Sequence, residues 1–256
     1  MTVELRVEGA VAKVVLNRPE KLNSLTWEMR QKLREYFHRV RFDDAIRAVL
    51  VTGEGRAFCT GADVGGMERR DLRGEREKLA QGSHSYMRIL HAIEKPVIAA
   101  VRGPTVGIGM SIAMCCDLVI ASETTRFAQI FRRIGLAPDG GAIWFLNHRL
   151  GMAKAKELVF TGRFVEAAEA LQLGLVNEVV PDDQLMDRAE ALARDLAEGP
   201  TFAMGLAKKM FHMANGSYED FLDLENFVQP QLGQTADHRE GVAAFKERRP
   251  AAFKGR

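Results

Sequence analysis

Two short apolar runs, each ending in or just before glycine, limit what this chain can fold into. They are "AVLVTG" at residues 48–53 and "PVIAAVRG" at residues 96–103. A half-exposed strand alternates apolar and polar residues, whereas an unbroken apolar run suits a strand that is buried on both faces. Strands of that kind belong to sheets covered by helices on both sides. The two runs therefore predict a layered α/β core.

Strand, loop and helix patterns recur through the first two thirds of the chain. Residues 3–17 have the alternation of two strands joined in a hairpin, and Thr26 precedes a helical pattern that it is suited to cap. After Asp139 the pattern is mainly helical, with one late strand at residues 175–181. The predicted architecture is an α/β core followed by a helical C-terminal region.

The charge composition excludes several classes of partner. The 256 residues are 46% hydrophobic and 27% charged, and 36 basic residues nearly balance 34 acidic ones. A net charge of +2 provides no electrostatic footprint for nucleic acid or for a membrane surface. The N-terminus lacks the layout of a signal peptide, and no apolar run is long enough to span a membrane. We expect a cytoplasmic protein that binds neither nucleic acid nor membrane.

The cysteines and histidines do not indicate a metal site. Cys59 stands alone, and Cys115 and Cys116 are adjacent in an apolar stretch without a CxxC spacing. That arrangement is typical of buried thiols in a reducing compartment. His91 and Glu94 form an HxxE pair without a third ligand, which a solvated helix face explains better than a metal.

Familiar nucleotide and hydrolase motifs are incomplete in this chain. The segment "GPTVGIG" has neither the GxGxxG spacing of a dinucleotide fold nor the GK[ST] end of a phosphate loop. The segment "GMSIA" approaches the GxSxG elbow of serine hydrolases, but its last position is alanine. Ser111 is therefore expected mainly as a small, packed helix residue.

Two segments, "VTGEGRAFCTGAD" and "AAVRGPTVGIGMS", combine a strand, a glycine-containing turn and a predicted helix. The first N–H groups of a helix lack intrahelical partners, and the peptide dipoles make that end partially positive. Two such ends that converge would form an oxyanion hole, a pair of donors that stabilises negative charge on a reacting oxygen. The alternative at either segment is that the glycines only mark turns.

Asp139 stands in "GLAPDGGA", between a proline and two glycines. Three roles suit it: the N-cap of the following helix, a turn residue, or an acid/base group held in a pocket. A capping bond lowers the pKa of an aspartate, whereas catalysis near neutral pH favours a raised pKa. The capping and catalytic roles thus predict opposite pKa shifts.

Several segments together resemble the enoyl-CoA hydratase/isomerase family, the crotonases. They are "LNRPEKLNSL", "FCTGADVGGM", "AAVRGPTVGIGMSIAMCCDLVIAS", "FAQIFRRIGLAPDGGA", "LVFTGRFVEAAEALQLGLVNEVVP" and "EGVAAFKERRPAAFKGR". Their order and spacing match the family over essentially the whole chain. Several motifs in order are more specific than any one of them alone.

The resemblance implies a crotonase-like spiral of ββα units over residues 1–198 and a helical trimerisation region over residues 199–256. It further implies a homotrimer or a dimer of trimers, and an acyl-CoA thioester substrate with no cofactor or metal beyond the coenzyme A that the substrate carries. By motif match, the oxyanion-hole N–H groups belong to Ala62 and Ile108. The matched positions near coenzyme A are Lys21, Leu22, Asp63, Val64, Gly65, Phe253 and Lys254.

The chain departs from the hydratase pattern at two decisive positions. Hydratases of this family carry glutamates where this chain has Ser111 and Phe131. An unaided serine is no base near pH 7, and phenylalanine has no proton to transfer. Asp139 instead resembles the isomerase branches, including the ring-epoxide isomerases, whose base occupies this position.

The sequence therefore predicts an enoyl-CoA isomerase in which Asp139 shuttles one proton. Three alternatives stay open: a hydratase of low efficiency, a thioester hydrolase using Ser111 or a water held by Asp139, and a non-catalytic acyl-CoA binder. If Asp139 proves to be only a cap, Glu68 is the next acid to consider.

Overall fold

The computed structural model describes residues 2–63, 65 and 71–256. Its main sheet has six strands in the order β1-β2-β3-β4-β6-β9, and only the β1–β2 pair is antiparallel. These strands are β1 (Val3–Glu8), β2 (Val11–Leu16), β3 (Ala48–Gly53), β4 (Val97–Val101), β6 (Leu118–Ser122) and β9 (Glu178–Val180). The predicted hairpin and both apolar runs thus form strands of this sheet.

A second sheet of three strands has the order β5-β7-β8. Its strands are β5 (Pro104–Val106), β7 (Arg126–Ala128) and β8 (Val165–Glu166). The sequence pattern did not indicate β8, because two residues are too few to show alternation. The expectation of only one strand after Asp139 was therefore wrong.

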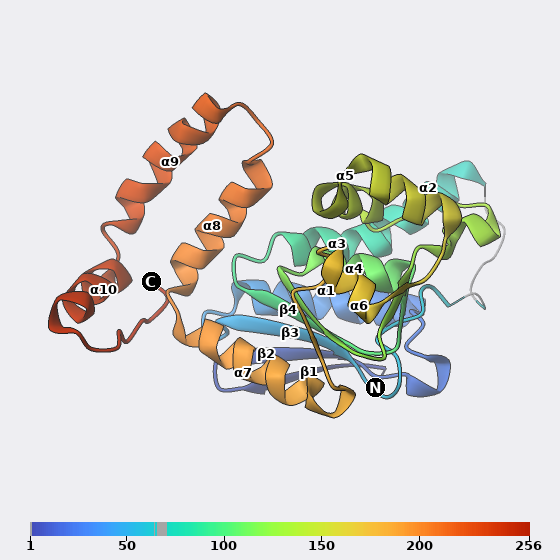
Figure 1. Cartoon of the computed structure of the whole chain (residues 1–256), viewed down its shortest axis with the longest axis horizontal. Helices are drawn as coiled ribbons and strands as arrows, with labels where there is room; N and C mark the ends of the chain where they lie inside the picture. The colour runs from blue at the N-terminus through green and yellow to red at the C-terminus, as the bar shows by residue number, and fades with distance from the viewer. Residues whose placement is uncertain (1, 64, 66–70) are drawn as a thin grey trace.

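The helices lie around the main sheet and beyond it (Figure 1). They are α1 (Trp27–Phe42), α2 (Leu72–Gln81), α3 (Ser83–His91), α4 (Ile108–Cys115), α5 (Ala142–Thr161), α6 (Ala167–Gln172), α7 (Leu185–Glu198), α8 (Thr201–Met213), α9 (Tyr218–Leu232) and α10 (Ala236–Glu247). The 3₁₀ turns whose bounds are described include η1 (Pro19–Lys21), η3 (Ile130–Ile134) and η4 (Asp182–Gln184). The Thr26 Oγ1 accepts a hydrogen bond from Met29 N at 3.2 Å, so Thr26 caps α1 as predicted.

The two faces of the main sheet pack against different helices. In β3, Ala48 and Leu50 belong to a core with α7, whereas Val49 and Val51 belong to the larger core with α1, α3 and α4. Alternate residues of one strand are thus buried on opposite faces, which is why its sequence is apolar throughout.

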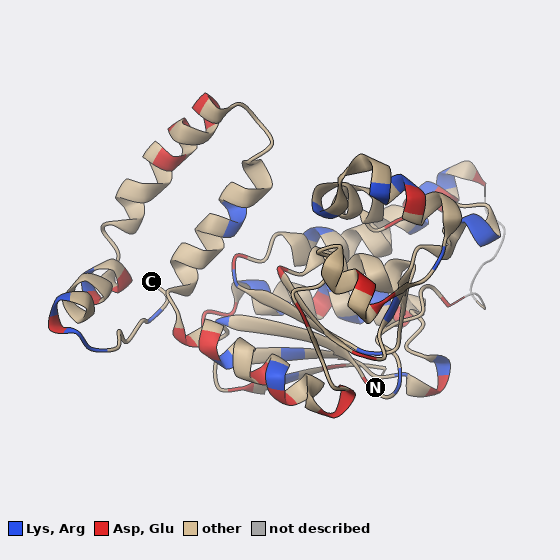
Figure 2. Ribbon diagram, in the orientation of Figure 1, with Lys and Arg blue, Asp and Glu red and all other residues tan. Residues whose placement is uncertain are grey.

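The C-terminal helices α8–α10 extend away from the layered part of the molecule, and the C-terminus lies beside α8 and α10 (Figure 1). Helix α7 ends at Glu198 and α8 begins at Thr201, on either side of the Gly199-Pro200 break. Acidic and basic residues are interspersed along the ribbon of the layered part (Figure 2). Within the described ranges, no helix combines the length and apolarity that crossing a membrane requires.

Candidate active site

Two segments that are far apart in the sequence run side by side at the end of the main sheet. Cys59 forms a parallel bridge with Thr105, and Val106 N donates to Cys59 O at 2.8 Å. A Cβ built on Gly107 would lie 3.9 Å from Gly61 Cα. The glycine turns that precede Ala62 and Ile108 are therefore neighbours in space.

Glycine is needed at two positions of this junction. Gly107 has a φ of +57°, a left-handed conformation that residues with side chains rarely adopt. A Cβ on Gly109 would lie 2.3 Å from Cys59 O, so any side chain there would push α4 away from the Cys59 segment. The glycines thus serve a close approach of two backbones as well as a turn.

The N–H groups of Ala62 and Ile108 make no hydrogen bond to a described residue. Ile108 is the first residue of α4, so its N–H belongs to the positive end of a helix. Ala62 forms a parallel bridge with Leu25, and residues 64 and 66–70 lie outside the described part of the chain. The expectation of a donor at a helix start is therefore confirmed for Ile108 and stays a prediction for Ala62.

The turn containing Asp139 packs directly against the start of α4. A Cβ built on Gly140 would lie 2.2 Å from Ile108 Cδ1 and 3.1 Å from Ser111 Cβ. Ser111 Oγ also donates a hydrogen bond to the Asp139 backbone carbonyl at 3.0 Å. Tertiary packing thus brings Asp139 next to the Ile108 turn.

The Asp139 carboxyl has one partner and one free oxygen. Ser83 Oγ donates to Asp139 Oδ2 at 3.1 Å, whereas Oδ1 is buried without a partner among the described residues. Burial raises the pKa of Asp139 above its ordinary value, against the lowering effects of Ser83, Arg30 and His84. The raised pKa is the direction expected for a base rather than for a cap.

Asp139 does not cap α5. The N-cap of this helix is Gly141, and no side chain supplies a capping hydrogen bond. The capping role that the sequence left open is therefore wrong, because the double glycine places Asp139 two residues before the cap.

A pocket of about 330 Å³ adjoins the junction. Ala62 and Asp63 form one side of it, and Arg30 of α1 is a further wall residue. A Cβ built on Gly82 would lie 3.3 Å from Arg30 Nη1, so this guanidinium also reaches the start of α3, next to Ser83. The pocket wall is thus continuous with the residues that hold Asp139.

Residues 6–256 match the family model described as enoyl-CoA hydratase/isomerase. The chain belongs to this family. It is 40% identical to a 1,2-epoxyphenylacetyl-CoA isomerase of Escherichia coli, with 98% of this chain and 97% of that protein covered. It is 39% identical to a probable enoyl-CoA hydratase of Rhodobacter capsulatus, with coverage of 100% and 98%.

The fold comparison agrees with the family assignment. A Mycobacterium abscessus protein titled putative enoyl-CoA hydratase/isomerase superposes with a TM-score of 0.95 at 32% identity, over 99% of this chain and 100% of that one. The chain therefore has the crotonase fold, as its motifs predicted, and is an acyl-CoA enzyme of the family.

At the two positions where hydratases of the family carry glutamate, this chain has Ser111 and Phe131. Ser111 is fully buried, and its Oγ is within hydrogen-bond distance of the carbonyls of Gly107 and Asp139. The Phe131 ring lies 3.5 Å from the position that a Cβ on Gly107 would take. Neither side chain can supply or accept a proton beside the junction.

Asp63 is held in an ion pair. Arg18 Nη1 donates to Asp63 Oδ2, and Gly65 N donates to Oδ1 at 2.9 Å. The hydrogen bond from Arg18 holds the pKa of Asp63 below its ordinary value. Asp63 and Asp139 are thus shifted in opposite directions, and only Asp139 has the environment of a base.

The remaining matched positions divide into three groups. Leu22 O accepts hydrogen bonds from Thr60 N at 3.1 Å and Thr60 Oγ1 at 3.2 Å, which ties the Lys21–Leu22 turn to the segment leading to Ala62. Val64 and Glu68 lie outside the described residues. Phe253 and Lys254 lie in the tail beside α10, where Lys254 N donates to Asp237 Oδ1 at 2.6 Å.

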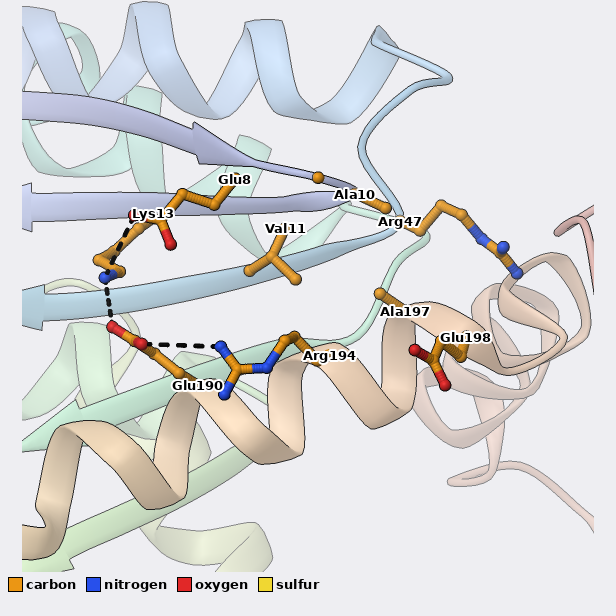
Figure 3. Close-up of a pocket in the computed structure, with 10 residues that line it drawn as sticks. Glu8, Ala10, Val11, Lys13, Arg47, Glu190, Arg194, Ala197 and Glu198 are labelled. Carbon is orange, nitrogen blue, oxygen red and sulfur yellow. Dashed lines mark hydrogen bonds and ion pairs between the residues drawn. The ribbon is translucent and has the colours of Figure 1, made fainter.

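A second, charged pocket of about 390 Å³ lies between the β1–β2 hairpin and α7 (Figure 3). Lys13 Nζ pairs with Glu190, whose other oxygen lies 3.7 Å from Arg194. Arg47 donates to the carbonyls of Gly199 and Phe253 at 2.5 and 3.0 Å. Because α7 covers the face of the sheet opposite α4, this pocket is separate from Asp139.

Sequence reasoning did not find Ser83, Tyr86 or Arg30. Ser83 and Tyr86 lie on α3, and Arg30 lies on α1, in segments that resemble ordinary amphipathic helices. Their link to Asp139 depends on packing between segments more than 50 residues apart, such as the 56 residues between Ser83 and Asp139. No local pattern carries that signal.

Proposed function

We propose that this protein moves a double bond in an enoyl-CoA thioester, with Asp139 as the proton shuttle. The Asp139 carboxylate takes a proton from C2 of a 3-enoyl-CoA, and the electron pair of that C–H bond delocalises into a dienolate. The backbone N–H groups of Ala62 and Ile108 stabilise the charge on the thioester oxygen. The Asp139 carboxyl then returns the proton to C4, which leaves the double bond between C2 and C3.

The environment of Asp139 is the observation that carries this proposal. Its carboxyl is half-buried beside the start of α4, one oxygen has no partner among the described residues, and its pKa is raised. A base with a raised pKa can both take a proton and hold it until it is returned. One such group suffices for a shift that requires no water.

The proposal favours isomerisation over hydration because, among the described acids of the junction, Asp139 has a raised pKa, whereas Asp63 is held in an ion pair with Arg18. Hydration of a double bond needs groups that activate a water and protonate the α-carbon. The two hydratase glutamate positions hold Ser111 and Phe131. The relative at 40% identity is named as an isomerase, while several other relatives are named as hydratases.

Thioester hydrolysis through Ser111 has less support. Ser111 is fully buried, and its hydroxyl lies within reach of two backbone carbonyls. A nucleophilic serine needs a base that accepts its proton, and a carbonyl oxygen is not one. A hydrolytic reaction would therefore have to use a water held by Asp139.

Parallel incubation with 3-enoyl-CoA and 2-enoyl-CoA tests the proposed reaction. We expect conversion of 3-enoyl-CoA to 2-enoyl-CoA, seen by absorbance with no change in mass. Addition of 18 mass units to 2-enoyl-CoA would identify a hydratase instead, and release of free thiol would identify a hydrolase. Binding of both esters without turnover would identify an acyl-CoA binder.

We also propose that the chain assembles as a homotrimer or a dimer of trimers through α8–α10. These helices expose several large apolar side chains, which a partner surface would cover. They are Phe202, Phe211, Met213, Tyr218, Phe227 and Phe245. In such an assembly, Phe253 and Lys254 would approach the coenzyme A of a neighbouring subunit.

Light scattering at micromolar concentration is expected to give the mass of three or six chains of 28.5 kDa. A stable monomer would contradict the assembly and, with it, the cross-subunit role of Phe253 and Lys254. Phe245→Ser, which changes an 86% exposed side chain on α10, is expected to weaken the assembly. Val7→Ser, which changes a 46% exposed residue of β1, is the matched control.

A further inference from the structure

The Ser111 hydroxyl connects two parts of the candidate site that come from distant segments. Ser111 is fully buried on α4, three residues after Ile108, and residues at that spacing lie on the same side of a helix. Its Oγ donates to the backbone carbonyl of Asp139 at 3.0 Å, across 28 residues of sequence. The proposed base is therefore attached to the helix whose first residue is the proposed oxyanion donor.

The carbonyl of Gly107, at 3.3 Å, is a second acceptor within reach of this hydroxyl. A serine inside a helix often bonds the carbonyl four residues earlier, and such a bond would have only a local role. The Gly107 carbonyl, however, already accepts from Ser111 N at 3.1 Å and from Gln129 Nε2 at 3.4 Å. The Asp139 carbonyl accepts from one other described group, Ala142 N at 3.2 Å, and its distance is nearer the value of about 2.8 Å that O–H···O bonds prefer. The hydroxyl is therefore better placed to hold the Asp139 turn than to bond its own helix.

The Asp139 turn meets the first turn of α4 at two points. A Cβ built on Gly140 would lie 2.2 Å from Ile108 Cδ1 and 3.1 Å from Ser111 Cβ, so the two turns are in close contact. Ile108 supplies an apolar contact, whereas Ser111 supplies a directional hydrogen bond. Without the Ser111 hydroxyl, this side of the turn would keep only the apolar contact.

We propose that Ser111 is a positioning residue, whose hydroxyl fixes the Asp139 turn, and with it the carboxyl, relative to the N–H of Ile108. The inference rests on the proposed function, because a proton shuttle has to stay aligned with C2 and C4 of an acyl group whose thioester oxygen is held at Ile108. A misplacement of about 1 Å can lower a rate by about 10²-fold. The position at which hydratases of the family carry glutamate thus serves, in this chain, to hold the base.

Hydrogen exchange followed by mass spectrometry tests the contact without turnover. In Ser111→Ala, the backbone amides of residues 139–145 are expected to exchange about 3- to 10-fold faster, because the turn opens more readily without the hydrogen bond. Thr125→Val is the matched control, since Thr125 is also fully buried and its Oγ1 donates to the Val101 carbonyl at 2.9 Å. This variant loses a hydrogen bond of the same kind and should keep the exchange rate of residues 139–145.

A double-mutant cycle tests whether Ser111 acts through Asp139. Ser111→Ala is expected to lower kcat with 3-enoyl-CoA by about 10-fold or more, while the affinity for a saturated acyl-CoA changes by less than about 2-fold. In the Asp139→Asn background the same substitution should have no further effect, because no base is left to position. Ser111→Cys keeps a weak donor of similar size, so its kcat should lie between those of the serine and alanine forms.

Unchanged exchange of residues 139–145 in Ser111→Ala would overturn the proposal, whatever the turnover. Additive losses of rate in the double variant, or full kcat despite faster exchange, would overturn it as well. A failure of the proposed function gives a different result, in which the unsubstituted protein itself does not isomerise 3-enoyl-CoA. Faster exchange in Ser111→Ala would then retain the contact between Ser111 and the Asp139 turn, and its catalytic consequence would be lost with the reaction.

Discussion

Asp139→Asn is expected to lower the isomerisation rate with 3-enoyl-CoA by about 10²- to 10⁴-fold, the usual cost of losing one general base. The amide has nearly the size of the carboxyl and can still accept a hydrogen bond from Ser83, but it is not a base near pH 7. Binding of a saturated acyl-CoA is expected to change little. Steady-state kinetics and calorimetry measure the two effects separately.

The melting temperature of Asp139→Asn at pH 7 is expected to be equal to or above that of the unsubstituted protein. The pKa of Asp139 is raised in the folded state, so its stability contribution is greatest below the unfolded pKa and is lost as the pH rises through the folded pKa. The asparagine side chain does not ionise, so the variant does not lose stability in this way as the pH rises. Asp71→Asn, at the real cap of α2, is the matched control and should retain full activity. A lowered melting temperature with retained isomerisation would contradict a catalytic role for Asp139.

The pH profile of the reaction should report the same carboxyl. Activity is expected to fall with decreasing pH as Asp139 is protonated, at a pH above the ordinary aspartate value of 3.8. The hydrogen bond from Ser83 lowers the pKa of Asp139, so Ser83→Ala should move this acid limb to higher pH. If the acid limb does not move in Ser83→Ala, the group that titrates is not hydrogen-bonded to Ser83, and Asp139 is not that group.

Ile108→Pro is expected to reduce turnover by about 10²- to 10³-fold, because proline lacks the N–H that we assign to the oxyanion hole. Ile108 is the first residue of α4, a position where proline fits the helix geometry and breaks no intrahelical hydrogen bond. The loss should therefore appear in kcat/KM while the helix content measured by circular dichroism stays the same.

Ile108→Ala and Ile108→Val are the controls for the lost side chain. Both keep the backbone donor, so we expect them to retain most of the activity. Ile108 Cδ1 lies close to Gly140, which follows Asp139. The activity of the alanine variant therefore also measures how much this contact contributes to the position of Asp139. Near-normal turnover in folded Ile108→Pro would show that this N–H is not a donor to the reacting oxygen.

Much of the fold could be predicted from local patterns. The apolar runs at residues 48–53 and 96–103 became strands with helices on both faces, and Thr26 caps α1. Gly107 precedes the helix whose N-terminus was expected at the second glycine turn. Such features are readable because backbone conformation and the exposure of alternate residues depend on near neighbours in the sequence.

The identity of the candidate acid could also be predicted, since the motif order placed Asp139 in the family pattern and placed Ser111 and Phe131 where hydratases carry glutamate. The short strand β8 could not, because its two residues are defined only by pairing with β7. The helix that the sequence predicts after the first glycine turn stays a prediction, because residues 64 and 66–70 lie outside the described residues.

Only the tertiary structure shows that Asp139 does not cap α5 and that its pKa is raised. Its pKa depends on how completely water is excluded and on partners that come from other elements, chiefly Ser83 of α3 and Arg30 of α1. The unpartnered Tyr86 hydroxyl likewise appears only when α3 packs into the core. The sequence by itself identified the candidate residues for the chemistry and the glycine turns beside them. Solvent exclusion and contacts between distant segments determined how Asp139 titrates, because both depend on distances that no local pattern encodes.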